Sequence, residues 1–122
     1  MSPANVEFGQ RVRELRESKR RTDPAFSLRR FAQSVGISAA FLSKVEMGEA
    51  LPPKAEKIKI MAELLGVNAD ELLALAGKVD PVLPQIIRER PNAMADFLRT
   101  ANEELTDEQI KELTRRMREG DL

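Results

Sequence analysis

The chain has 122 residues, of which 42% are hydrophobic and 33% charged, with 20 basic and 20 acidic side chains. This composition is typical of a globular protein rather than a disordered one. The length fits one domain, or a small domain with an appendage. No apolar run approaches the ~18 residues that a membrane-spanning helix needs. Because the N-terminus also lacks a basic-then-apolar signal, we expect a cytoplasmic protein with no membrane contact.

The chain contains neither cysteine nor histidine. Disulfides, thiolate nucleophiles, histidine-dependent catalytic triads and the usual zinc sites are therefore excluded. Catalysis would have to rest on carboxylates, Lys or Ser, and these are scattered with no glycine-rich phosphate loop beside them. We therefore expect no enzyme activity, no cofactor and no metal site.

The zero net charge conceals an asymmetry along the chain. Residues 1–53 hold nine Lys and Arg against six Asp and Glu, whereas residues 54–122 hold eleven against fourteen. A positive excess is what DNA phosphates attract, although an ordinary solvated face can carry the same excess. A nucleic-acid contact is thus more plausible in the N-terminal half.

In chain order, the first predicted helix begins with Ser2 as its cap and Pro3 in its first turn. Its buried stripe follows the spacing i, i+4, i+7 and consists of Phe8, Val12 and Leu15. Residues 19–26 predict a loop, because Pro24 and polar residues interrupt the helical pattern. Three basic side chains of this loop could contact a DNA backbone or simply be solvated: Lys19, Arg20 and Arg21.

Residues 27–48 predict two short helices hinged at a glycine. The first begins at Ser27 and has an apolar face formed by Leu28, Phe31, Ala32 and Val35. Gly36 ends it, since a left-handed residue readily terminates a helix. Ser38 caps the second helix, whose buried positions are Val45 and either Phe41 or Leu42. This arrangement is typical of a helix-turn-helix, although a plain helical hairpin has the same periodicity.

Two further helices complete this region. Pro53 suits the first turn of a helix with a stripe formed by Ile58, Met61, Ala62, Leu65 and Val67. Gly66 ends that helix, and the sequence from Asn68 to Glu71 is a capping box that opens the next one. The last helix buries Leu72, Leu73 and Leu75, and we expect it to stop at Gly77.

Eight residues match the pattern A, G, V/I, S, I/L, S, E, G of a known family, namely Ala32, Gly36, Ile37, Ser38, Leu42, Ser43, Glu46 and Gly48. From about Phe8 to Gly77 the chain resembles the phage-repressor-like (Xre-type, lambda-repressor-like) helix-turn-helix transcriptional regulators. The resemblance implies an all-α fold, with a five-helix DNA-binding domain in residues 1–77 and a short helical extension in residues 78–122. It implies a sequence-specific regulator, preferably a dimeric repressor. The alternative is an antitoxin or partner-binding protein that neutralises a cognate protein and autoregulates its operon.

The resemblance also implies which residues contact double-stranded DNA. The second helix of the motif is the recognition helix, and its base-reading candidates are Ala39, Ala40, Phe41, Ser43 and Lys44. The candidates for backbone contacts are Ser27, Leu28, Arg29, Ser38, Lys54, Lys19, Arg20 and Arg21. Leu28 departs from the family, which often has Gln after the cap, and Arg29 is a possible substitute.

Arg16 and Glu46 fall where the family has a structural pair that joins its first helix to the recognition helix. A partly desolvated Arg–carboxylate pair can be bidentate. The alternative is that Arg16 reaches a phosphate.

Residues 78–122 predict three amphipathic helices. The first begins at Asp80-Pro81 and is broken by Pro91, Asn92 caps the second, and a capping box at 106–109 opens the third. Helices this short bury little alone, so we expect them to pack on another surface. A homodimer, which would bind a palindromic operator, is the preferred interpretation. A cap over the N-terminal domain and a docking surface for a protein partner are the alternatives.

Overall fold

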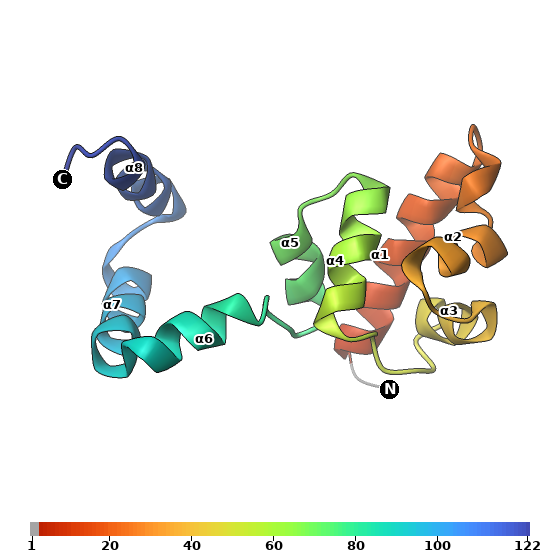
Figure 1. Ribbon diagram of the computed structural model, residues 1–122, viewed down its shortest axis with the longest axis horizontal. Helices are drawn as coiled ribbons and strands as arrows, with labels where there is room; N and C mark the ends of the chain where they lie inside the picture. Colours follow the sequence, from red (N-terminus) through yellow and green to blue (C-terminus); the bar gives the residue numbers. More distant parts are fainter. Residues whose placement is uncertain (1–2) are drawn as a thin grey trace. The chain divides into compact units, whose positions relative to one another are not determined.

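A computed structural model of the protein describes residues 3–122 (Figure 1). All regular elements in this range are helical, which confirms the predicted all-α fold. The chain divides into two compact units, Met1–Pro81 and Val82–Leu122. The first contains α1 (Pro3–Arg20), the 3-10 helix η1 (Pro24–Phe26), α2 (Leu28–Val35), α3 (Ala39–Glu46), α4 (Ala55–Leu65) and α5 (Ala69–Leu75). The second contains α6 (Val82–Glu89), α7 (Pro91–Glu104) and α8 (Asp107–Arg118).

One hydrophobic core holds the first unit together. All five of its α-helices contribute buried side chains. The buried hydrophobic residues are Phe8, Val12, Phe31, Ala32, Val35, Leu42, Val45, Ile58, Met61, Ala62, Leu65, Leu72, Leu73 and Ala76. The predicted apolar stripes supply nearly all of this core. Where the sequence left two choices on the recognition helix, Leu42 is fully buried and Phe41 packs at the margin. Each fully buried large side chain contributes about 1.5–3 kcal/mol of transfer free energy, so the core fixes how these helices pack.

The predicted helix ends of the α2–α3 region are confirmed. The Ser27 hydroxyl accepts a hydrogen bond from the Arg30 N–H (3.3 Å), and the Ser38 hydroxyl accepts one from the Phe41 N–H (3.0 Å). Gly36 ends α2 with φ +90°, a left-handed conformation that L side chains rarely adopt. The turn between the two helices is therefore set by local chemistry.

Gly9 lies in the interior of α1, where glycine costs about 1 kcal/mol relative to alanine. A Cβ atom built on Gly9 would lie 2.0 Å from the carbonyl oxygen of Val45. The backbones of α1 and α3 therefore touch at this point, and only glycine permits the approach. The sequence pattern did not single out Gly9.

Two boundaries in the first unit differ from those predicted. α1 continues to Arg20, so Lys19 and Arg20 belong to a helix rather than a loop. Basic side chains in a last turn interact favourably with the helix dipole. α4 begins at Ala55 with Lys54 as its N-cap, so Pro53 precedes the helix instead of lying in its first turn. The predicted cap Ser2 lies outside the described residues.

The end of the first unit is tied to α4. Gly77 follows α5 with φ +69°, but the unit continues to Pro81, four residues past the expected boundary. The Lys59 ammonium nitrogen lies 2.9 Å from a carboxylate oxygen of Asp80. At the other end of α5, the Asn68 side chain accepts a hydrogen bond from the Glu71 N–H (3.0 Å). A capping box has two side chain-to-backbone hydrogen bonds, and the described residues form this one of the two.

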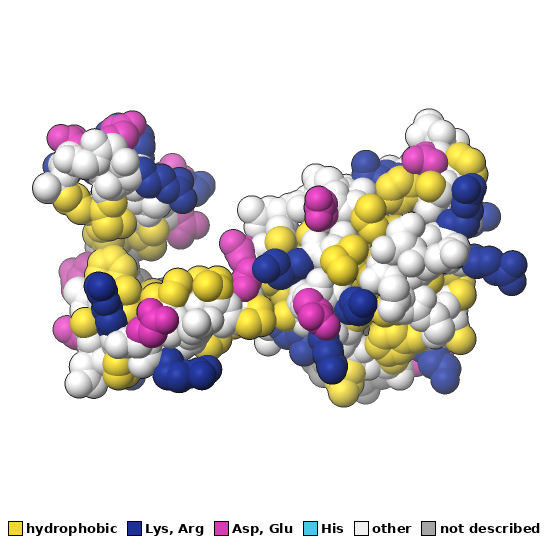
Figure 2. Space-filling model, viewed as in Figure 1, with side chains coloured by type: hydrophobic (Ala, Val, Ile, Leu, Met, Phe, Trp, Pro, Cys, Tyr) yellow, Lys and Arg dark blue, Asp and Glu magenta, His cyan; other side chains and the backbone are white. Residues whose placement is uncertain are grey.

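The second unit is helical but carries no buried side chain in α6, α7 or α8. α6 and α7 pack against each other, and hydrophobic side chains remain in the open on all three helices (Figure 2). The exposed large ones are Val82, Leu83, Ile86, Phe97, Leu98, Ile110 and Met117. No helix within residues 3–122 is long and apolar enough to cross a bilayer.

Helix starts in the second unit agree with the sequence at one place and correct it at another. The predicted capping box of α8 is confirmed, since Thr106 and Gln109 exchange side chain-to-backbone hydrogen bonds of 3.2 and 2.8 Å. The predicted cap of α7 is wrong, because Arg90 is the N-cap and Pro91 already lies in the first turn. Proline suits that position because it has no N–H to leave unpaired.

Candidate nucleic-acid interface

The recognition helix α3 presents one face to the core and another to solvent. Leu42 and Val45 are buried and fix its orientation. Of the base-reading candidates, Ala40 and Lys44 are exposed, whereas the half-buried ones are Ala39, Phe41 and Ser43. Ala39 and Phe41 pack against the edge of the core. Only two of the five base-reading candidates on α3 are therefore exposed.

Arg16 and Glu46 form a buried ion pair between α1 and α3. Arg16 Nε donates to Glu46 Oε2 (2.7 Å) and Nη2 donates to Oε1 (2.8 Å), a bidentate arrangement. The two residues are 3% and 8% exposed. Hydrogen bonding to Glu46 raises the pKa of the Arg16 guanidinium, against the opposing effect of burial.

Two further contacts occupy the same guanidinium. Nη1 donates to the carbonyl oxygen of Phe26 (3.1 Å), and Nη2 donates to a carboxylate oxygen of Glu17 (3.1 Å). All three nitrogens of the Arg16 guanidinium therefore donate to acceptors within the fold.

The basic residues among the predicted backbone contacts fall into two groups. Lys19 is half-buried, with its ammonium 5.6 Å from the centroid of the Phe26 ring, and Arg20 lies 3.5 Å from Glu17. These two side chains have partners inside the unit. The others are exposed and form no ion pair within residues 3–122, namely Arg21, Arg29 and Lys54. Among the predicted contacts, these three cations remain available to phosphates.

The start of α2 offers backbone donors. The first N–H groups of a helix have no partner inside it, and together with the helix dipole they favour an anion. Leu28, where the family often has Gln, is half-buried against the core. Its side chain therefore contributes packing. Ser27 and Ser38 use their hydroxyls as caps.

A polar pocket of about 280 Å³ lies between α1, α2 and α3. Its lining residues are Arg13, Arg16, Glu17, Arg20, Leu28, Ser43, Glu46 and Met47. Arg13 was not among the sequence candidates. The available signal was its spacing from Arg16 and Arg20, at i+3 and i+7, which places all three on one face of α1.

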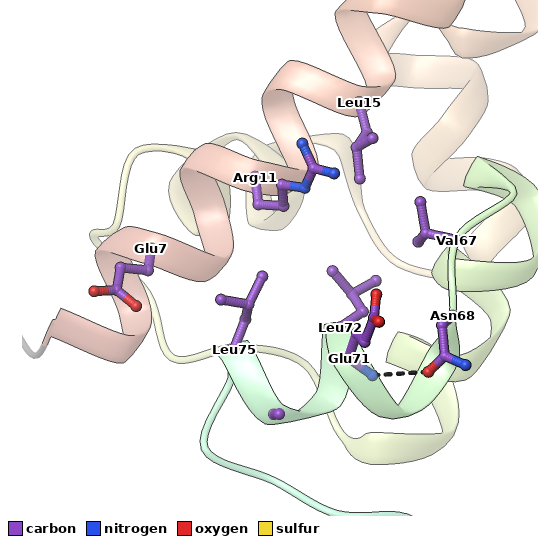
Figure 3. Close-up of a pocket in the computed structure, with 9 residues that line it drawn as sticks. Glu7, Arg11, Leu15, Val67, Asn68, Glu71, Leu72 and Leu75 are labelled. Atoms are coloured by element: carbon purple, nitrogen blue, oxygen red, sulfur yellow. Dashed lines mark hydrogen bonds between the residues drawn. The ribbon is translucent and has the colours of Figure 1, made fainter. Parts of the chain in front are cut away.

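A second, more apolar groove lies between α1 and α5. In Figure 3, Arg11 and Leu15 of α1 face Leu72 and Leu75 of α5. Successive helical residues are about 100° apart, so Arg11 and Arg13 lie on nearly opposite sides of α1.

Within the described residues no group of three or more acidic side chains is arranged to hold a metal ion.

Comparison with known proteins identifies relatives of the chain. The chain is 39% identical over 89 residues to the uncharacterized HTH-type transcriptional regulator RghRB of Bacillus subtilis (strain 168), a match that covers 73% of this chain and 57% of the relative. It is 35% identical over 75 residues to the HTH-type transcriptional repressor RghR of the same organism, covering 62% and 52%. A third relative, the uncharacterized HTH-type transcriptional regulator YazB, is 37% identical over 65 residues, covering 53% and 86%.

The chain thus spans little more than half the length of the first two relatives. No solved structure matches it. The family model described as "Helix-turn-helix domain" matches residues 7–75, which is more than half of the chain and includes α2 and α3. This match agrees with the resemblance that the sequence motif implied. The chain belongs to the helix-turn-helix domain family.

Proposed function

We propose that the chain is a sequence-specific DNA-binding transcriptional regulator, and specifically a repressor, that reads the major groove with α3. The observation that carries the proposal is the two-sided character of α3. Leu42 and Val45 hold the helix in the core, whereas Ala40 in the first turn and Lys44 in the last turn are exposed to solvent. One relative named as a transcriptional repressor supports this choice.

The chemistry of the exposed face suits base edges. The methyl group of Ala40 can contact a thymine methyl, and the Lys44 ammonium can donate to guanine O6 and N7. The unpaired cations Arg21, Arg29 and Lys54 would then hold the phosphates on either side.

The test is to select bound sequences from a random DNA pool and measure affinity for the selected site by fluorescence anisotropy. Ala40→Glu places a carboxylate against the duplex, and we expect a loss of ~100-fold or more, since a like-charge contact costs several kcal/mol. The fold should remain intact, because an acid in a first turn suits the helix dipole. Ala74→Glu, at an exposed alanine of α5, is the control for adding a negative charge elsewhere on the unit. Retained affinity in Ala40→Glu would defeat the proposal.

We propose further that two copies bind a palindromic operator as a homodimer joined through residues 82–122. Seven large hydrophobic side chains are exposed on α6, α7 and α8, and no residue of these helices is buried. Helices of this length are marginal in water without packing partners. A dimer would set two recognition helices about one DNA turn apart, ~34 Å.

Sedimentation of the full chain at tens of micromolar tests the dimer, which we expect to be the main species. A monomer would refute it. A monomer that forms a stable complex with a second protein would favour the antitoxin-like alternative.

A further inference from the structure

We propose that the polar pocket between α1, α2 and α3 seats one phosphate of the bound DNA, with Arg13 as its main ligand. The inference rests on the proposed function and adds a contact made by α1, outside the helix-turn-helix itself. The pocket has a volume of about 280 Å³, which is ample for a phosphate oxygen and its hydration.

One of the basic side chains that line the pocket has no acidic partner among the described residues. Arg16 is bound to Glu46, and Glu17 accepts contacts from Arg16 (3.1 Å) and Arg20 (3.5 Å). Arg13 is exposed and makes no ion pair within the described residues. Three arginines against two glutamates give the pocket a charge of +1, which matches one phosphodiester anion.

The pocket is lined partly by residues of α2 and α3, the two helices that would lie against DNA under the proposed function. Leu28 is the first residue of α2, whose N-terminal N–H groups favour an anion. Ser43 of α3 lines the same pocket and is half-buried. The Leu28 side chain cannot donate a hydrogen bond, and Arg16 and Arg20 already have acidic partners. The side-chain donors left for a phosphate are therefore the Arg13 guanidinium and the Ser43 hydroxyl. This assigns Ser43 to a phosphate rather than to a base.

The structure supplies a matched control on the same helix. Arg11 is exposed like Arg13 and carries the same charge, but it lies over the groove between α1 and α5 and 3.9 Å from a carboxylate oxygen of Glu14 (Figure 3). Arg13→Ala and Arg11→Ala therefore remove one charge each from α1 at sites two residues apart. Their affinities for the selected operator and for a scrambled duplex should be measured between 50 and 200 mM salt.

We expect Arg13→Ala to weaken binding to both duplexes by about tenfold, because a phosphate contact carries no sequence information. The slope of log affinity against log salt should fall in magnitude by ~0.9, the value for one phosphate contact. Arg11→Ala should leave both quantities unchanged. Arg13→Lys should keep the slope, and thermal melts should be the same for all three variants.

Equal affinities and slopes for Arg13→Ala and Arg11→Ala, with specific binding by the wild type, would overturn the pocket while leaving the proposed function standing. A changed preference at one operator position would overturn it too, since Arg13 would then read a base. A loss in Arg13→Ala accompanied by a lower melting temperature, and shared by Arg13→Lys, would show that Arg13 acts on the fold. A wild type without sequence-specific binding would refute the proposed function itself.

Discussion

The buried Arg16–Glu46 pair allows a quantitative prediction about stability. Glu46→Ala removes both acceptors of a bidentate contact and leaves a guanidinium that is 3% exposed. Losing one partner of a buried pair costs ~3–5 kcal/mol. Arg16 retains the carbonyl of Phe26 and the carboxylate of Glu17, so we expect the lower end, ~3 kcal/mol. In a unit of this size each kcal/mol lowers Tm by about 4–8 °C, which predicts a fall of ~12–24 °C.

The assay is thermal unfolding followed by circular dichroism. Glu17→Ala is the matched control, because it removes a half-exposed partner of the same guanidinium and should cost no more than about 1 kcal/mol. Because the pKa of Arg16 is raised, its stabilising charge persists to a higher pH than the charge of free arginine, which is already protonated far above neutral pH. The effect of Glu46→Ala should therefore be the same at pH 7 and pH 9. A Tm within about 2 °C of the wild type would refute the reasoning.

Three further outcomes follow from the packing and the exposed surface. Gly9→Ala should lower Tm, because a Cβ 2.0 Å from the Val45 carbonyl oxygen meets backbone that cannot move aside. We expect an overpacking cost of about 3 kcal/mol, at the upper end of the usual range and more than the ~1 kcal/mol that helix propensity returns; a melt at or above wild type would contradict this close approach. Lys44→Ala should cost ~1–3 kcal/mol of DNA binding and relax preference at one base pair, whereas uniform weakening with a salt slope smaller by about one would assign Lys44 to phosphate. Truncation after Pro81 should leave a folded monomer, because every buried side chain described lies before that residue, and its binding to a palindrome should fall steeply; an intact dimer by sedimentation would contradict it.

Periodicity and capping chemistry predicted the five α-helices of the first unit, although the loop expected at residues 19–26 contains the end of α1 and the 3-10 helix η1. Apolar spacing identified its buried residues, and Ser27, Gly36 and Ser38 marked the helix ends because each acts on backbone groups only a few residues away. The predictions failed where proline had two possible roles. Pro53 precedes a helix and Pro91 lies inside the first turn of one, and a local pattern does not separate these positions.

Features that depend on contacts between distant residues could not be predicted from periodicity. Gly9 matters because Val45 lies against it, and a lone glycine in a helical pattern does not reveal its neighbour. The spacing of Arg13, Arg16 and Arg20 marked a shared helix face, but not the pocket that α2 and α3 complete. Family resemblance supplied the partner of Arg16, 30 residues away in the sequence.

The separation of the two faces of α3 has a consequence for how its specificity can change over time. Leu42, Val45 and Glu46 fix the helix, whereas exposed positions away from such features tolerate replacement within about ±0.5 kcal/mol of stability. Ala40 and Lys44 can therefore vary with little effect on folding. A combinatorial library confined to these two codons would keep a foldable scaffold in nearly every member. Duplicated copies of such a gene could diverge toward new operators without first acquiring compensating mutations in the core.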